Sequence, residues 1–86
     1  MSPQPLRPIS WLKFEKFVLD QGYEFKRQKG SHRVYSKPEV LRPVIIPAHT
    51  FDIPISVIAN NLRTMGIPTE EYSKYMATHK KKRRPR

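Results

Sequence analysis

The chain has 86 residues, which gives room for one small domain and excludes a second. It carries 17 Lys and Arg against 7 Asp and Glu, a formal net charge of +10, and this excess indicates a polyanionic partner such as nucleic acid. The lack of cysteine excludes disulfides and a thiolate zinc site, and the lack of a long apolar run or signal-peptide core predicts a cytoplasmic protein without membrane contact.

The two ends of the chain differ from its middle. Residues 1–8 contain three prolines and no apolar period, so we expect an extended arm. Residues 80–86 hold six of the 17 basic groups, and because like charges repel one another we expect a disordered basic tail over residues 79–86. The domain predicted between them, over residues 9–78, is basic in its own right.

The first predicted element is a helix that begins after Ser10 and runs to about Gln21. Ser10 offers an N-cap, and Gly22 suits the left-handed position that ends a helix. Apolar residues recur along it at helical spacing, so one face must pack against the rest of the domain. These residues are Trp11, Phe14, Phe17 and Val18, with Leu12 and Leu19 beside them.

A strand over residues 23–28 comes next, because polar and apolar side chains alternate along it. Lys29-Gly30 supplies a tight turn, after which residues 31–36 return as a second, polar strand. The alternation places Tyr23 and Phe25 on one side of the first strand and Glu24, Lys26 and Gln28 on the other.

The second half of the chain predicts one more strand and two helices. Residues 44–46 form a short apolar run that Pro47 stops, and this strand is the most buried candidate. Pro54 suits the first turn of an amphipathic helix that ends at Gly66, and Thr69 can cap a last short helix. The order predicts an α+β, two-layer sandwich, α-β-β-β-α(-α), with a three-stranded antiparallel sheet laid out like a double-stranded-RNA-binding domain.

Basic residues crowd the first two strands and the turn between them. Only Glu24 and Glu39 oppose the six cations of residues 26–42, so we expect phosphate contacts there. Gly30 provides a positive φ or a close backbone approach, and Ser31 can donate to a phosphate oxygen or bond nearby backbone. The predicted RNA-binding and phosphate-binding residues are Lys26, Arg27, Lys29, Gly30, Ser31 and Arg33.

His32 follows this turn and is the candidate for proton transfer, since histidine exchanges protons near neutral pH. Strand parity places His32 with Val34 and Ser36, opposite Arg33 and Tyr35, but leaves open which side faces solvent. The alternative is a structural histidine that bonds backbone.

Two further residues are secondary candidates. His49 lies in the loop after the third strand and is either a second acid or base or a residue that structures the loop. Tyr35 can stack a base or donate to phosphate, although aromatic residues of a small domain more often belong to its core. Three histidines and scattered acids give no metal-ligand cluster, so we expect no metal and no other cofactor.

Taken in order, several of these segments resemble the HicA toxins of bacterial toxin–antitoxin systems. They are Gly22-Tyr23, then Gly30-Ser31-His32, then residues 44–49, and finally Met65-Gly66-Ile67; the resemblance covers roughly residues 9–76. It implies a double-stranded-RNA-binding-like fold, mRNA interferase activity and a HicB-type antitoxin that binds and blocks the toxin. It also implies that His32, in the Gly-Ser-His motif, is the catalytic residue.

RNA cleavage without a metal uses the neighbouring 2′-hydroxyl as nucleophile, with one group that removes its proton and another that stabilises the leaving oxygen. We expect His32 to fill one of these roles, with Lys29 and Arg33 as phosphate-side helpers. The competing hypothesis is a noncatalytic RNA-binding module with the same fold. A DNA-binding regulator is less favoured, because the helix over residues 55–65 has few cations beyond Arg63.

Overall fold

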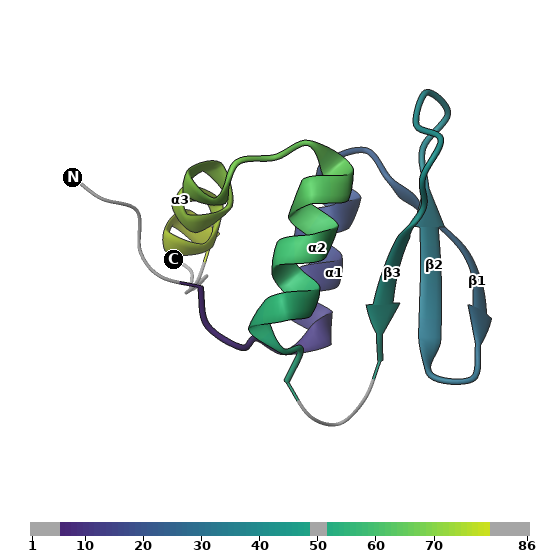
Figure 1. Ribbon diagram of the computed structural model, residues 1–86, viewed down its shortest axis with the longest axis horizontal. Helices are drawn as coiled ribbons and strands as arrows, with labels where there is room; N and C mark the ends of the chain where they lie inside the picture. Colours follow the sequence, from purple (N-terminus) through teal and green to yellow (C-terminus); the bar gives the residue numbers. More distant parts are fainter. Residues whose placement is uncertain (1–5, 49–51, 80–86) are drawn as a thin grey trace, which may run out of the picture.

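The computed structural model describes residues 6–48 and 52–79 and has the predicted order of elements (Figure 1). Three antiparallel strands form one sheet in the order β1-β2-β3, so the α+β class and the α-β-β-β-α-α order are confirmed. The likeness to a double-stranded-RNA-binding domain stays a prediction. The elements are α1 (Trp11–Asp20), β1 (Glu24–Lys29), β2 (His32–Ser36), β3 (Val44–Pro47), α2 (Ile55–Met65) and α3 (Thr69–His79).

Local sequence signals set the ends of the helices. The Ser10 hydroxyl accepts a hydrogen bond from the Leu12 N–H at 3.2 Å, as expected of an N-cap at the start of α1. Gly66 ends α2 with a φ of 72°, the left-handed conformation that glycine adopts at little cost. No helix in the described ranges has the length and apolar character needed to cross a bilayer.

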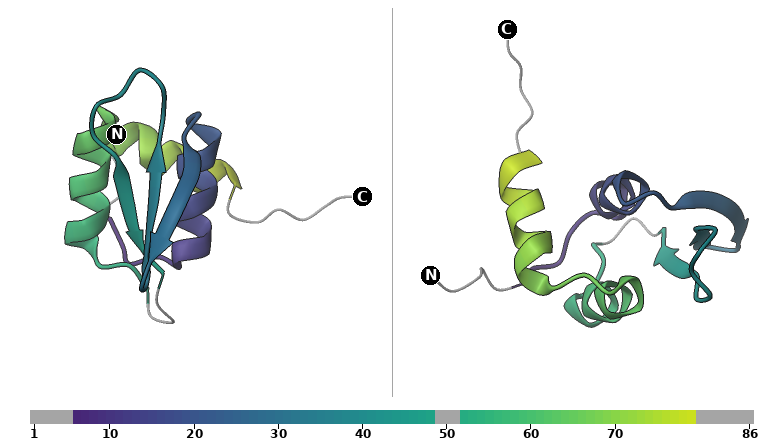
Figure 2. Two further views of the ribbon diagram at one scale, coloured as in Figure 1. Left: turned by 90° about the vertical axis from the view of Figure 1, so that its right-hand side faces the viewer. Right: turned by 90° about the horizontal axis from the view of Figure 1, so that it is seen from above.

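The helices lie on one face of the sheet and leave the other face open (Figures 1 and 2). α1 and α2 cover the inner face, whereas α3 lies on the far side of these two helices from the sheet. Tyr72 of α3 makes an edge contact with Phe17 of α1, with ring centroids 5.0 Å apart. The two predicted layers are therefore present, and α3 adds a cover outside them.

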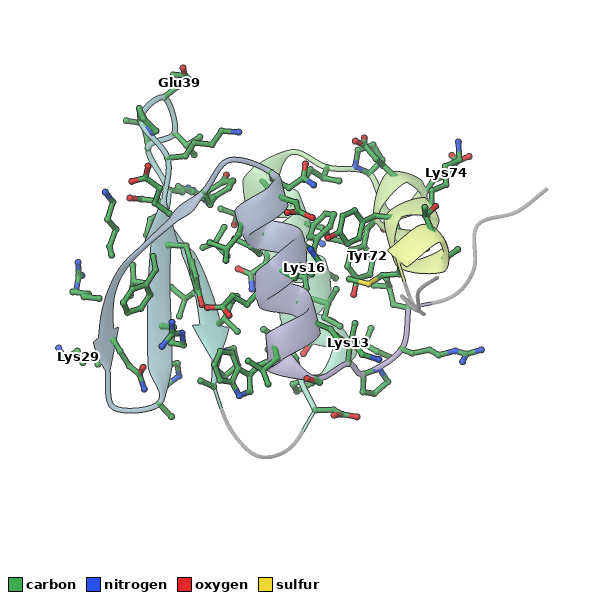
Figure 3. The ribbon with its side chains drawn as sticks, turned by 180° about the vertical axis from the view of Figure 1, so that it is seen from behind. Lys13, Lys16, Lys29, Glu39, Tyr72 and Lys74 are labelled. Atoms are coloured by element: carbon green, nitrogen blue, oxygen red, sulfur yellow. The ribbon has the colours of Figure 1, made fainter. Side chains whose placement is uncertain are left out.

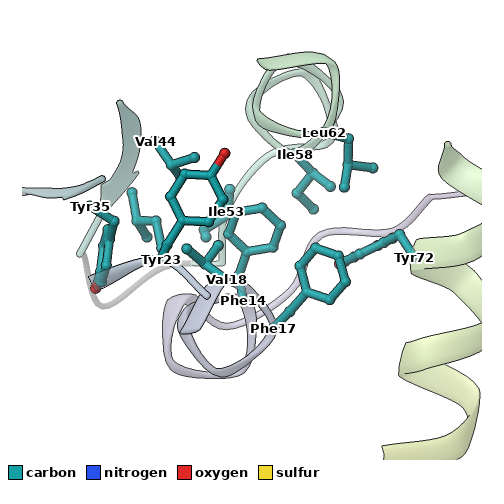
Figure 4. Packing of buried hydrophobic residues seen from close by; sticks show 11 residues of the cluster. Phe14, Phe17, Val18, Tyr23, Tyr35, Val44, Ile53, Ile58, Leu62 and Tyr72 are labelled. Atoms are coloured by element: carbon teal, nitrogen blue, oxygen red, sulfur yellow. The ribbon is translucent and has the colours of Figure 1, made fainter. Parts of the chain in front are cut away.

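The core fills the space between the sheet and the helices (Figure 4). Val44 and Ile46 of β3 are both fully buried, while Ile45 between them is 43% exposed, because alternate residues of a strand face opposite sides. Asn61 of α2 donates to the Ile45 carbonyl at 3.0 Å and so joins that helix to β3. Burial of these apolar side chains is the main stabilising contribution in such a small domain.

A β-bulge in β1 changes which of its side chains face outward. Phe25 lies opposite Tyr35, but Arg27 rather than Lys26 lies opposite Val34, so Lys26 is the extra residue. The prediction of simple alternation is therefore wrong beyond Phe25. Residues directly opposite in an antiparallel sheet share a face, so Arg27 and Lys29 join the open face while Gln28 turns toward the helices.

Candidate nucleic-acid interface and catalytic site

His32 lies at one end of the open face of the sheet. In the register of the strands it is opposite Lys29 on one side and Pro47 on the other. Its neighbour Arg33 and the buried Tyr35 belong to the inner face, and His32 is exposed. The structure thus decides the question that parity left open: the imidazole is on the solvent side of the sheet.

The hairpin turn before His32 consists of Gly30 and Ser31. Gly30 has a φ of 59°, which suits the first central position of a two-residue hairpin turn and accounts for a glycine there. The Ser31 carbonyl accepts a hydrogen bond from the Ala48 N–H at 2.6 Å. The turn is therefore attached to the end of β3 as well as to β1.

Two cations of β1 stand beside His32 on the open face. Arg27 and Lys29 are exposed, and neither forms an ion pair with any residue in the described ranges. Lys29 lies at the outer end of β1, next to the hairpin turn (Figure 3). Lys26, the bulge residue, is within 3.4 Å of a Glu24 carboxylate oxygen. Among the predicted phosphate-binding cations, Lys26 thus has an acidic neighbour, whereas Arg27 and Lys29 have none in the described ranges.

Arg33 follows His32 in the chain, but its side chain lies on the opposite face of the sheet. Its guanidinium Nη2 lies 3.1 Å from Glu15 Oε2 of α1, and the two side chains are only 22% and 19% exposed. The strand register places it opposite Gln28, also on the inner face. Its charge is therefore matched by a carboxylate beneath the sheet, and the structure does not bring it together with Lys29.

Tyr35 is fully buried, and its hydroxyl is occupied. The hydroxyl donates to Glu15 Oε2 at 2.5 Å and accepts from Arg33 Nε at 2.9 Å. Burial, followed by the hydrogen bond to the Glu15 carboxylate, raises the pKa of Tyr35 to about 12. A fully buried ring cannot stack on a base from solvent, so the core interpretation of Tyr35 fits this structure.

Another cation of the basic window, one secondary candidate and the basic tail do not belong to this cluster. Lys37 donates to the Gln21 carbonyl at 2.8 Å and so bonds the C-terminal end of α1. His49 and the basic tail from Lys80 onward lie outside the described residues. Within the described ranges, no three His, Cys, Asp or Glu side chains gather closely enough to hold a metal ion.

Glu15 is the residue of this region that the sequence analysis missed. It is four residues after Trp11 and three before the buried Val18, so it lies on the same stripe of α1 as these apolar side chains. An acid on the stripe that packs against a sheet is costly to bury without a cationic partner. An acidic residue on the apolar stripe of a helix therefore predicts a nearby cation, although the sequence does not identify that cation.

The geometry places an exposed histidine, two exposed cations and an apolar centre on one open sheet face. The apolar centre is the cross-strand row of Val34 and Ile45. A comparison with known protein families finds a match to the family described as the HicA toxin of bacterial toxin–antitoxin systems. The match covers residues 11–67, a stretch that runs from the start of α1 past the end of α2. No curated protein and no solved structure matches the chain.

Proposed function

The chain belongs to the HicA toxin family of bacterial toxin–antitoxin systems, and from this we propose that it is an mRNA interferase that cleaves single-stranded mRNA through His32. Cleavage of mRNA stops translation and growth until an antitoxin neutralises the toxin. The observation that carries the proposal is the exposure of His32 on the open face of the sheet, directly opposite Lys29. A histidine buried beneath the helices would have no access to a polymer.

His32 acts in this proposal as a general acid or base. The ribose 2′-hydroxyl next to the scissile phosphate is the nucleophile; the imidazole accepts its proton or protonates the leaving 5′-oxygen. This reaction uses a group of the substrate as its nucleophile and needs no metal. The products are a 2′,3′-cyclic phosphate on one fragment and a 5′-hydroxyl on the other.

Arg27 and Lys29 supply the phosphate contacts. Both are exposed on the face that carries His32, and their side chains are available to an anion. A cation close to the scissile phosphate stabilises the additional negative charge of the transition state. The turn leaves room for a phosphate to approach, because an atom placed at the Cβ position of Gly30 would have no neighbour within 4 Å in the described part of the chain.

An antitoxin partner follows from membership of a toxin–antitoxin family. We propose that this partner is of the HicB type and that it blocks the toxin in the cytoplasm, where mRNA is available. The positive charge of the chain, +10 in total, favours association with an acidic partner surface as well as with RNA.

The second candidate is a noncatalytic RNA-binding module. The cross-strand row of Val34 and Ile45 favours it, because an apolar surface flanked by Arg27 and Lys29 would hold an unstacked strand whether or not His32 does chemistry. The two functions differ in one outcome only, which is whether the bound RNA is cut.

The test is cleavage and binding of one labelled single-stranded RNA by the wild type, His32→Ala and Ser36→Ala, all in EDTA. Ser36 is the matched control, since it shares the strand and the face of His32 but lies at the other end of β2. We expect His32→Ala to slow cleavage by about 10²–10⁴-fold with little change in the dissociation constant for RNA. Ser36→Ala should cleave at the wild-type rate.

The reaction products provide a second, independent readout. A substrate with 2′-deoxyribose at the cleavage position should bind but remain uncut, and the cut RNA should carry a 2′,3′-cyclic phosphate. A wild type that binds several mRNAs and cuts none would replace the enzyme proposal with the binding module. Equal cleavage by the wild type and His32→Ala would refute the role of His32 while leaving a nuclease.

A further inference from the structure

The side chain of Arg33 is held by three hydrogen bonds on the inner face of the sheet. Nε donates to the Tyr35 hydroxyl at 2.9 Å, Nη1 donates to Gln28 Oε1 at 2.8 Å, and Nη2 donates to Glu15 Oε2 at 3.1 Å. Each guanidinium nitrogen therefore has its own acceptor. The fixed fork of donors makes arginine, and not lysine, suited to this arrangement.

Aromatic rings enclose the same guanidinium. Its carbon lies 4.1 Å from the centroid of the Phe25 ring and 5.2 Å from that of Trp11. Such contacts with a ring face favour a planar cation. The rings come from β1 and from the first residue of α1, so the guanidinium joins the hairpin to the helix beneath it.

Gln28 connects Arg33 to the turn that precedes His32. Its amide oxygen accepts from Arg33, and its amide nitrogen donates to the Gly30 carbonyl at 2.9 Å. A continuous path of hydrogen bonds thus runs from Glu15 on α1 through Arg33 and Gln28 to the backbone of the turn. His32 is the second residue after that carbonyl.

From these contacts we propose that Glu15, Gln28 and Arg33 are positioning residues: they fix the Gly30-Ser31 turn against α1 and thereby fix the backbone that presents His32 to RNA. The inference rests on the proposed role of His32 and assigns Arg33 a task other than phosphate binding. Binding of Arg33 to a phosphate on the open face would leave the Glu15 carboxylate and the Tyr35 hydroxyl without this partner in a largely buried site.

The experiment compares Arg33→Lys and Glu15→Gln with two matched controls, Arg63→Lys and Glu71→Gln. The controls are the same substitutions at exposed positions of α2 and α3. Three properties are measured on folded protein: the kcat and KM of RNA cleavage, amide hydrogen exchange at residues 30–32, and the salt dependence of RNA binding. Lys29→Ala serves as the reference for loss of a phosphate contact.

We expect Arg33→Lys and Glu15→Gln to lower kcat by about tenfold or more with little change in KM, since small displacements of a catalytic group slow reactions strongly. Exchange at residues 30–32 should become about tenfold faster, and the controls should match the wild type. Arg33→Ala, which removes the charge, is added for RNA binding alone: the log–log salt slope should stay unchanged in this variant, whereas Lys29→Ala should flatten it by about 0.7.

Three outcomes would overturn the proposal. One is unchanged exchange at residues 30–32 in both variants. Another is an Arg33→Lys enzyme with wild-type kcat, because lysine keeps the charge but cannot make the three bonds. The third is Arg33→Ala flattening the salt slope as much as Lys29→Ala does. If the wild type does not cut RNA, the exchange measurement still decides whether the turn is fixed by Arg33, so failure of the proposed function is distinguishable.

Discussion

The two faces of the sheet differ in what surrounds their charged side chains. On the inner face, Arg33 meets a carboxylate, a phenol and an amide. On the open face, Arg27 and Lys29 extend into solvent beside His32. Cations only a few residues apart in the chain therefore have different surroundings. The face on which a cation lies decides whether a ligand in solvent can reach it.

Because the two faces differ in this way, a high density of positive charge along the sequence does not by itself locate a binding surface. The cations of residues 26–37 divide among the open face, the bulge, the inner face and the end of α1. Arg33 and Lys37 are bonded to other parts of the fold, whereas Arg27 and Lys29 are exposed to solvent. Substitutions on one face or the other should therefore change the free energy of unfolding by different amounts.

The largest expected effect concerns two isoleucines of β3 that lie on opposite faces of the sheet. Ile46→Ala removes a fully buried side chain and should lower the free energy of unfolding by about 2–5 kcal/mol. Ile45→Ala, on the open face at 43% exposure, should cost less than about 1 kcal/mol. Urea unfolding followed by circular dichroism measures both. Equal losses would mean that the open face is also packed in solution, for example against a second copy.

A second prediction uses the pH dependence of the buried phenols. The pKa of Tyr35 and of Tyr72 is raised to about 12 in the folded protein, mainly by burial, against 10.0 for the free side chain. The folded state therefore keeps protons that the unfolded chain loses above pH 10. Stability should be intact below pH 10 and fall as pH rises toward 12, by about 1.4 kcal/mol per pH unit for each tyrosine.

Denaturant unfolding at several alkaline pH values, with phenolate absorbance recorded in parallel, measures this loss. Tyr72→Phe is the sharper variant, because it removes one titrating group from the interface between α3 and α1 and should reduce the slope. Phenolate that forms near pH 10 without unfolding would show that these hydroxyls reach solvent, and would contradict the burial of Tyr35 under the sheet and of Tyr72 between α3 and α1.

The smallest expected effect concerns the bulge. Deletion of Lys26 converts the bulge into regular pairing and leaves Arg27 and Lys29 on the open face, so fold and RNA cleavage should persist. Lys26→Ala is the matched reference, since it removes the same exposed charge but keeps the bulge. The two variants should differ in free energy of unfolding by less than about 1 kcal/mol. Loss of cleavage in the deletion alone would mean that the bulge itself shapes the site.

Local patterns predicted most of the framework. The Ser10 cap, the Gly30 turn and the glycine after α2 depend on a few neighbouring residues, and the structure places them as the sequence indicated. The fully buried Phe14 likewise follows from helical spacing. The family resemblance read from the ordered motifs is confirmed over residues 11–67. The roles of His32 and of the basic residues stay predictions.

The sequence by itself determined the number, order and type of the elements, because caps, turns and periodicity act over a few residues of chain. Only the tertiary structure decided which side of β2 faces solvent, since this depends on where α1 and α2 pack. It also decided the register at the bulge and the pairing of Glu15 with Arg33, eighteen residues apart. Contacts between distant segments leave no periodic signal, so the division of the cations between the two faces emerges only when the sheet is assembled.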